Sequence, residues 1–193
     1  MKIILLNGPP RSGKDYAGRV LLEHLPAGTP IVKMAKELKE RTHALYRLVD
    51  EDGPYPHDFY EAVKDTPLDE FEGITPRQAY IAVSELLIKP LHGDKQFGRW
   101  LCNYLERLED EGVSTVVVTD AGFLGECEVL VDNFGPENCL LARIHRVGYT
   151  FAGDSRSYLD LDHLQVQCQD INNDGADGFR TSLATALRLA SPA

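Results

Sequence analysis

The amino-acid sequence predicts an α/β protein in which a mostly parallel sheet of about five strands carries helices on both faces. Three observations predict this class. Short aliphatic runs alternate with longer stretches of helical spacing over nearly the whole chain. The run at 2–6 is continuously apolar and stops at a glycine-rich turn, as a strand buried on both faces does. A second run, at 113–119, is rich in β-branched residues and ends at Asp120.

The other elements follow from the spacing of apolar residues and from the turn residues between them. Thr75 and Pro76 indicate a helix start, with Thr75 as the N-cap and Pro76 in the first turn. The proline-rich, acidic stretch at 50–73 predicts a long connection with one short helix at 59–64, and the polar stretch at 148–162 predicts a surface loop. We expect further strands at 30–33, 139–145 and 166–171, and helices at 14–25, 35–49, 75–89, 95–109, 123–134 and 176–189.

Composition and charge limit the domain count and the partners. The 193 residues suffice for one domain, with a core at 1–49 and 111–193, a helical insertion at 50–110 and a lid at 146–163. The formal net charge of -10 comes from acids spread along the chain, which disfavours a broad nucleic-acid surface but leaves room for a local basic pocket. The four cysteines lie far apart and are expected to be reduced thiols. The first apolar run is too short for a signal peptide, and no stretch reaches the roughly 18 apolar residues that a membrane helix needs, so we expect a soluble, cytoplasmic protein without a membrane partner.

The stretch NGPPRSGKDY, which begins at Asn7, has the form of a phosphate-binding loop. Two glycines, Gly8 and Gly13, bracket four residues, and Lys14 follows. Glycines let the backbone wrap around a polyphosphate, the next helix offers the positive end of its dipole, and the lysine places a charge on the β and γ phosphates. The buried strand before the loop and the helix after it are the context that this interpretation requires. The residues expected to bind ATP are Gly8, Pro9, Pro10, Arg11, Ser12, Gly13, Lys14, Asp15 and Tyr16.

Two aspartates are candidate ligands for Mg²⁺. Asp120 follows a predicted buried strand, and the carboxyl ends of parallel strands open into the crevice where such sheets bind ligands. Asp15 stands directly after Lys14, where a serine or threonine normally coordinates the ion. A carboxylate is also an acceptable ligand for Mg²⁺, and the alternative, that Asp15 is a first-turn acid favoured by the helix dipole, stays open.

These residues resemble the bacteriophage-type deoxynucleoside monophosphate kinases, a group with the nucleoside monophosphate kinase-like phosphate-loop fold. The segment RSGKD, with aspartate after the lysine, is typical of that group. The segment GITPRQAYIAVSELL at 73–87 resembles its Thr-Pro-Arg segment, and VVVTDAGFLGECEVL at 116–130 is similar to its Asp-x-Arg-Phe-x-x-Glu segment. Less specific similarities, in matching order, are KMAKELKE at 33–40, FGRWL at 97–101, DSRSYLD at 154–160 and NNDG at 172–175.

The resemblance implies transfer of the γ-phosphoryl group of ATP to a deoxynucleoside 5′-monophosphate, with Mg²⁺ as cofactor. Phosphoryl transfer depends mainly on positioning and charge neutralisation, so the expected catalytic residues are cationic or metal-binding. They are Lys14, Arg11, Arg143, Arg146 and Asp120, with Arg156 of the predicted lid as a further candidate. The residues expected at the acceptor are Lys64, Arg77, Glu85, Trp100, Asp120 and Phe123. For Phe59, Tyr60 and Trp100, contact with the base and ordinary packing in the insertion both stay open.

One position departs from the family pattern. Where the family usually has an arginine after the third strand, this chain has Gly122. Either another arginine, Arg77 or Arg99, compensates, or the acceptor is not an ordinary monophosphate. The alternative activity is phosphorylation of a hydroxymethyl group on a modified pyrimidine, free or in DNA, and a second alternative is a non-catalytic nucleotide-binding module. DNA as an acceptor and a homodimer stay open, and the resemblance suggests a phage protein acting in the host cytoplasm.

Overall fold

The computed structural model describes residues 1–50, 53–54 and 57–189, and the chain divides into two compact units. The first unit comprises Met1–Met34 and Gly98–Ala193, and the second is Ala35–Phe97. The first unit holds a five-stranded sheet, whereas the second is mainly helical. All described members of the phosphate loop belong to the first unit.

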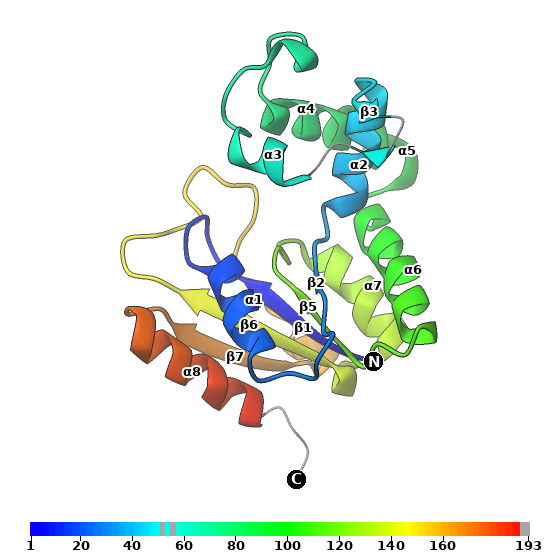
Figure 1. The fold of residues 1–193 in the computed structure, drawn as a ribbon. Coiled ribbons are helices and arrows are strands. Elements are labelled where there is room, and N and C mark those ends of the chain that lie inside the picture. Colours follow the sequence, from blue (N-terminus) through cyan, green and yellow to red (C-terminus); the bar gives the residue numbers. More distant parts are fainter. Residues whose placement is uncertain (51–52, 55–56, 190–193) are drawn as a thin grey trace. The chain divides into compact units, whose positions relative to one another are not determined.

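The sheet of the first unit is parallel throughout, with the order β2-β5-β1-β6-β7 (Figure 1). The strand β1 is therefore central, with β5 on one side and β6 on the other. All five expected strands are confirmed. They are β1 (Lys2–Asn7), β2 (Ile31–Val32), β5 (Thr115–Val118), β6 (Cys139–His145) and β7 (Gln167–Asn172).

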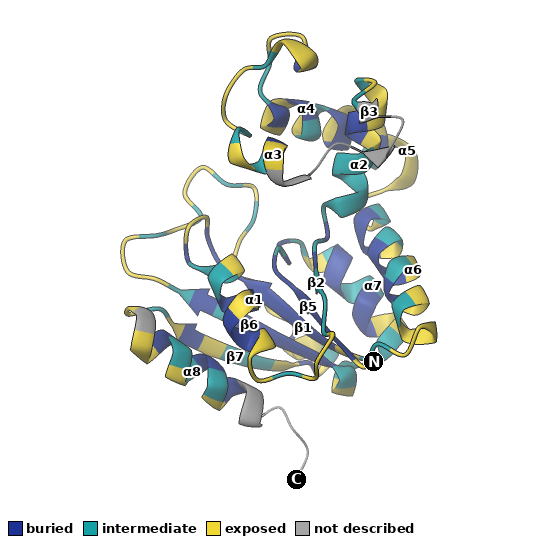
Figure 2. Cartoon of the chain, in the orientation of Figure 1, coloured by how far each residue is buried: buried dark blue, intermediate teal, exposed yellow. Residues whose placement is uncertain are grey.

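Helices cover both faces of this sheet, which confirms the predicted fold class (Figure 1). One face carries α1 (Lys14–Leu22) and α8 (Ala176–Leu189), and the other carries α6 (Gln96–Asp110) and α7 (Leu124–Phe134). The strands are mostly buried, while exposed residues gather on the outer turns of the helices and in the loops (Figure 2). The result is a three-layer α/β unit in which the phosphate loop joins the central strand to α1.

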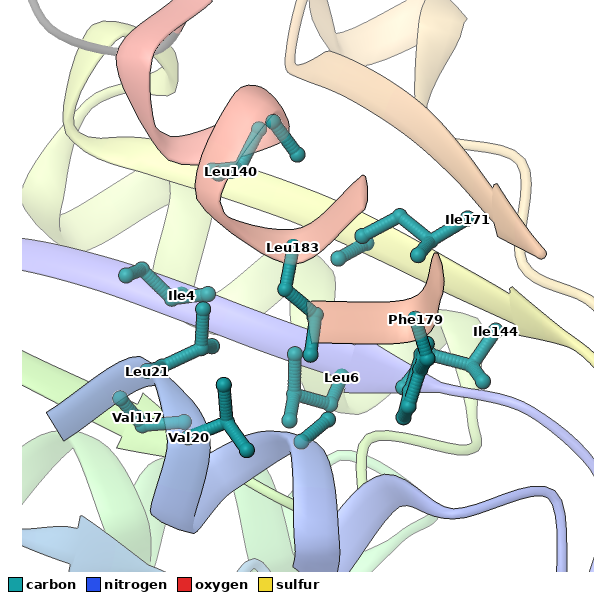
Figure 3. Close-up of a cluster of buried hydrophobic side chains, with 13 residues drawn as sticks. Ile4, Leu6, Val20, Leu21, Val117, Leu140, Ile144, Ile171, Phe179 and Leu183 are labelled. Atoms are coloured by element: carbon teal, nitrogen blue, oxygen red, sulfur yellow. The ribbon is translucent and has the colours of Figure 1, made fainter. Parts of the chain in front are cut away.

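The continuous apolar run of β1 is explained by burial on both faces. Ile3 and Leu5 are fully buried on one side, and Ile4 and Leu6 are buried on the other. Ile4 and Leu6 belong to a cluster that the sheet shares with α1 and α8, in which Leu183 of α8 is also fully buried (Figure 3). Burying a side chain of this size contributes about 1.5–3 kcal/mol, so this cluster fixes α1 against the sheet.

The second unit is a small helical body with a two-stranded hairpin. Its expected helix start at Thr75 is confirmed, because the Thr75 hydroxyl accepts from Gln78 N–H at 3.1 Å and the Gln78 side chain accepts from Thr75 N–H at 2.9 Å. The expected helix at 75–89 is present as three consecutive helical segments, the middle one a π-helix. The elements are α2 (Lys36–Leu45), β3 (Val49–Asp50), β4 (Gly53–Pro54), α3 (His57–Ala62), η1 (Asp69–Phe71), α4 (Pro76–Val83), η2 (Ser84–Ile88) and α5 (Lys89–His92).

An aromatic cluster forms the core of the second unit. The fully buried His43 ring lies 4.9 Å from the Tyr60 ring and 5.7 Å from the Tyr80 ring, and its Nε2 is 2.8 Å from the Tyr80 hydroxyl. Phe71 is also fully buried there. Tyr60, left open between base contact and packing, is therefore a packing residue, whereas Phe59 is 49% exposed.

Several predicted helix boundaries are wrong by a few residues, and for two of them the backbone explains the earlier end. The helix α1 ends at Leu22 rather than at residue 25, because Pro26 disfavours helical backbone just before it and the chain tightens into turns at Glu23 and His24. The helix α2 ends at Leu45 rather than at residue 49, because Arg47 has a φ of 58° and leaves the helical region. All four cysteines are free thiols, as predicted. Within the described part of the chain, no helix combines the length and apolarity needed to cross a bilayer.

Candidate nucleotide-binding site

The loop between β1 and α1 has a geometry that only glycine permits at two positions. Gly13 caps α1 with a φ of 105°, in the left-handed region. A Cβ on Gly8 would lie 2.7 Å from the Ile144 carbonyl oxygen and 2.7 Å from the Ser12 hydroxyl oxygen, so no side chain fits there. Gly8 is thus required by the close approach of the loop to the end of β6, and Gly13 by its left-handed backbone conformation.

The start of α1 offers backbone N–H groups to an anion. The first bond of the helix runs from Ala17 N–H to the Gly13 carbonyl at 2.8 Å. The N–H groups of Lys14, Asp15 and Tyr16 therefore precede the helical hydrogen-bond ladder, and they stand at the positive end of the helix dipole. This is the arrangement that binds phosphate in other phosphate loops.

The carbonyl oxygens of the loop are held by surrounding donors. The Lys14 ammonium donates to the Gly8 and Pro9 carbonyls at 2.6 and 2.7 Å. Arg146 donates to the Arg11 carbonyl at 2.8 Å, and the Asn173 amide donates to the Ser12 carbonyl at 2.7 Å. Each of these donors satisfies a carbonyl oxygen of the loop and so holds the loop backbone in this conformation. The sequence did not predict this contact of Asn173, although the residue belongs to the NNDG segment at the end of β7.

Opposing effects act on the pKa of Lys14. Burial, followed by the positive charge of Arg156, lowers the pKa of Lys14 from 10.5 to about 8. Three carboxylates, Asp15, Asp154 and Asp120, act in the opposite direction. The loop therefore holds a lysine whose protonated form would gain from an added anion, which is the expected property of a phosphate site.

The two predicted magnesium ligands differ in their surroundings. Asp120 follows β5, and one of its carboxylate oxygens accepts from Met34 N–H at 2.6 Å. The side chain of Asp15 is 68% exposed, and its Oδ1 lies 3.5 Å from the Nζ of Lys33. Among the described residues no three His, Cys, Asp or Glu side chains form a metal cluster. Mg²⁺ in phosphate sites needs only one or two carboxylates together with phosphate oxygens, so Asp15 and Asp120 fit an ion that arrives with a nucleotide.

A buried hydroxyl supports the phosphate interpretation of the loop. Ser12 is fully buried, and its hydroxyl oxygen finds no hydrogen-bond partner within the described structure. Buried polar groups are nearly always satisfied, so such a group calls for a ligand or water. A phosphate oxygen in the cradle has the chemistry to satisfy it.

Arg143 lies within β6 and Arg146 follows this strand directly, and both already have partners. Arg143 makes a bidentate pair with Asp170 of β7 at 2.9 and 2.7 Å and donates to the Leu159 carbonyl at 3.3 Å. This pair raises the pKa of Arg143. The Arg146 guanidinium lies on the Tyr149 ring, 4.5 Å from its centroid, and reaches the phosphate loop through Arg11. Arg146 thus already touches the loop, whereas Arg143 would have to leave Asp170 to meet a phosphate.

His145, which the sequence does not single out as catalytic, joins the same network. Its Nε2 lies 2.6 Å from Asp170, and its ring stacks on Tyr158 at 4.4 Å. These contacts tie the loop between β6 and β7 to the sheet, so the histidine has a structural role here.

The predicted acceptor residues fall on both units. In the second unit, Lys64 pairs with Glu61, which Lys39 also contacts at 2.6 Å, and these lysines lower the pKa of Glu61 to about 2 against the opposing effect of burial. Arg77 pairs with Asp65 at 2.6 Å, and Glu85 pairs with Lys89 at 2.6 Å. In the first unit, Trp100 and Arg99 lie on α6, and Phe123 precedes α7.

Comparisons with known proteins give structural likeness only. No protein-family model matches the chain, and no curated protein sequence matches it. A sugar kinase from Janibacter sp. is similar over 98% of this chain and 93% of its own, with 12% identity and a TM-score of 0.48. A gluconokinase from Sinorhizobium meliloti is similar over 98% of this chain and 93% of its own, with 16% identity and a TM-score of 0.42. A Thermus thermophilus protein is similar over 100% of this chain and 98% of its own, with 14% identity and a TM-score of 0.47. The fold class is defined by the sheet order and the phosphate loop of the chain itself.

Proposed function

We propose that this protein is an ATP-dependent phosphotransferase of the phosphate-loop class. One arrangement carries the proposal: Lys14 and the start of α1 follow the central strand β1, and Asp120 follows β5, the strand that pairs directly with β1. A cradle for a triphosphate and a carboxylate for its divalent ion thus stand at the same edge of the sheet. No covalent partner is needed for phosphoryl transfer, and the site offers cations and backbone donors instead.

The acceptor that we propose is a deoxynucleoside 5′-monophosphate, which would yield the diphosphate and ADP. The support is the sequence resemblance carried by the RSGKD and Thr-Pro-Arg segments. In this proposal Lys64 and Arg77 bind the acceptor phosphate, because arginine pairs bidentately with phosphate oxygens. The same resemblance assigns Glu85, Trp100 and Phe123 to recognition of the sugar and base of the acceptor.

The roles of the site residues follow from their chemistry. Lys14 places its charge on the donor phosphates, and Arg11 and Arg146 neutralise the group in transfer. Asp15 and Asp120 would hold Mg²⁺, which would supply positive charge to the donor phosphates. Arg143 is assigned the same role as Arg146, on the condition that it leaves Asp170.

A screen for acceptor-dependent ADP release tests the proposal. ATP turnover is measured with the four common dNMPs, with modified dNMPs and with DNA that contains hydroxymethyluracil. We expect turnover with at least one free dNMP, and Lys14→Met should abolish it while its unfolding curve stays within about 1 kcal/mol of the wild type. Retained turnover in Lys14→Met would remove the loop from the mechanism.

The same screen separates the alternative functions. Gly122, which stands where the related kinases usually have an arginine, is the observation that favours a hydroxymethyl group as the acceptor. That activity would appear as ADP release with the modified base or the modified DNA only. Tight ATP binding without release for any acceptor would indicate a non-catalytic nucleotide-binding module.

A further inference from the structure

Gly122 leaves room for one particular side chain. A Cβ placed on Gly122 would lie 2.4 Å from Cδ and 2.9 Å from Cγ of Arg156. Both distances are shorter than any ordinary carbon–carbon contact, so the stem of Arg156 occupies the space directly over the Gly122 backbone. The φ of Gly122 is not positive, so steric exclusion by Arg156, rather than backbone strain, is what an added side chain would meet.

Arg156 is fixed in this place by Asp154, two residues before it in the sequence. Its Nε and Nη2 donate to the two carboxylate oxygens of Asp154 at 2.8 and 2.6 Å, and its backbone N–H donates to the same carboxylate at 3.0 Å. The side chain of Asp154 is only 16% exposed and that of Arg156 only 26% exposed. A half-buried bidentate pair of this kind orients the guanidinium with little freedom.

The chain on the other side of Arg156 is tied to the sheet. Asn7, the last residue of β1, is fully buried, and its amide nitrogen donates to the carbonyls of Ala121 and Ser157 at 3.0 and 3.1 Å. Its amide oxygen accepts from Leu159 N–H at 3.1 Å. One side chain thus joins the end of the phosphate-loop strand, the residue before Gly122 and the residue after Arg156.

Arg156 has both a cation and carboxylates near it. Arg156 lies close enough to Lys14 for their positive charges to repel each other, while the carboxylate of Asp154, followed by those of Asp120 and the buried Glu126, raises the pKa of Arg156. Holding two cations near each other in a half-buried site is unfavourable in the free protein. A polyphosphate between them would reverse the sign of that interaction.

We propose that Arg156 is a phosphate-binding catalytic residue of this site and that it takes the place, in space, of an arginine two residues after Asp120. Because Gly122 has no side chain, the side chain of Arg156, from the loop between β6 and β7, has room to reach this edge of the sheet. The consequence for substrate class is that the site keeps a full set of phosphate-binding cations, as an ordinary monophosphate acceptor requires. The catalytic part of the proposal rests on the phosphotransferase function proposed above.

The test measures phosphate binding as well as turnover, because binding does not depend on the proposed reaction. Calorimetry gives the affinity for inorganic tripolyphosphate and for ADP with Mg²⁺, and the coupled assay gives kcat with the best acceptor. Arg156→Ala should weaken tripolyphosphate binding by about tenfold to a hundredfold, as the loss of a charged hydrogen-bond donor does, and should lower kcat by at least about a hundredfold. Arg19→Ala, which removes an exposed arginine of α1, is the matched control and should change neither.

A double-variant cycle tests the role of Gly122. Gly122→Ala alone should weaken tripolyphosphate binding, because its methyl group displaces the stem of Arg156. The same change in the Arg156→Ala background should have an effect below about twofold, because the clash is then absent. Equal effects in both backgrounds, or binding by Arg156→Ala within twofold of the wild type, would overturn the proposal.

Two further observations keep the outcomes distinct. If Arg156→Ala does not fold, Arg156→Lys keeps the stem and the charge but lacks the bidentate fork, and it should show an intermediate loss of binding and kcat. A wild-type protein that binds tripolyphosphate through Arg156 but transfers no phosphoryl group would refute the phosphotransferase function and keep Arg156 as a phosphate ligand. A wild-type protein that does not bind tripolyphosphate would refute both.

Discussion

The side chain of Asn7 gives the sharpest stability prediction. It makes three hydrogen bonds, to Ala121, Ser157 and Leu159, and it is fully buried. Each such bond contributes about 1 kcal/mol net, and Asn7→Ala also leaves backbone partners buried without a bond. We therefore expect Asn7→Ala to lower the free energy of unfolding by about 3 kcal/mol, a large share of the stability of a single domain.

Urea unfolding followed by circular dichroism measures this loss. Asn138→Ala is the matched control, because Asn138 makes one bond from its amide, to the Phe134 carbonyl at 2.7 Å, at the end of α7, and one longer contact to Glu137. It should cost about 1 kcal/mol. Asn7→Asp keeps the acceptor for Leu159 N–H but turns an oxygen toward two carbonyls, so it should destabilise at least as much as Asn7→Ala. A loss below about 1 kcal/mol in Asn7→Ala, or one equal to that of the control, would refute the joining role of this residue.

Three other measurements follow from the site and the thiols. Burial, followed by the charge of Arg156, lowers the pKa of Lys14 to about 8 against the opposing effect of Asp15, Asp154 and Asp120. Above that pH the lysine becomes neutral, so the affinity for ADP should fall between pH 7 and 9, and an affinity that is constant over this range would contradict the assignment. Arg77→Ala should mainly raise the KM of the acceptor with little change in kcat, and an unchanged KM would place the acceptor pocket elsewhere. Burial raises the pKa of all four thiols, but Cys168 is only partly buried whereas the other three are buried, so a thiol reagent should modify Cys168 first and the others only on unfolding.

The parts of the fold that could be predicted are those whose signal is local. The run at 2–6 is apolar on both faces because β1 lies in the middle of the sheet, and the spacing of Gly8, Gly13 and Lys14 encodes the loop after it. The capping box at Thr75 is likewise written in adjacent residues. These features need no knowledge of distant contacts.

The remaining features depend on tertiary contacts that no short segment reveals. The pair of Gly122 and Arg156 joins positions separated by more than thirty residues, and the glycine by itself suggested only a missing cation. The roles of Asn7 and Asn173 depend on which carbonyls the folded chain brings to them. The hairpin of β3 and β4 is too short to give an alternating pattern, so the sequence predicted only a connection there.

The two prolines of the phosphate loop have a consequence for binding energetics. Pro9 and Pro10 have fixed φ angles and no N–H. Arg11, which follows them, has a φ of 63°, and its carbonyl oxygen accepts a hydrogen bond from Arg146. A loop restrained in this way has little conformational entropy left to lose when a nucleotide arrives. Calorimetry should therefore show a small entropic penalty for ordering this turn, at the expense of two fewer amide donors to the phosphates.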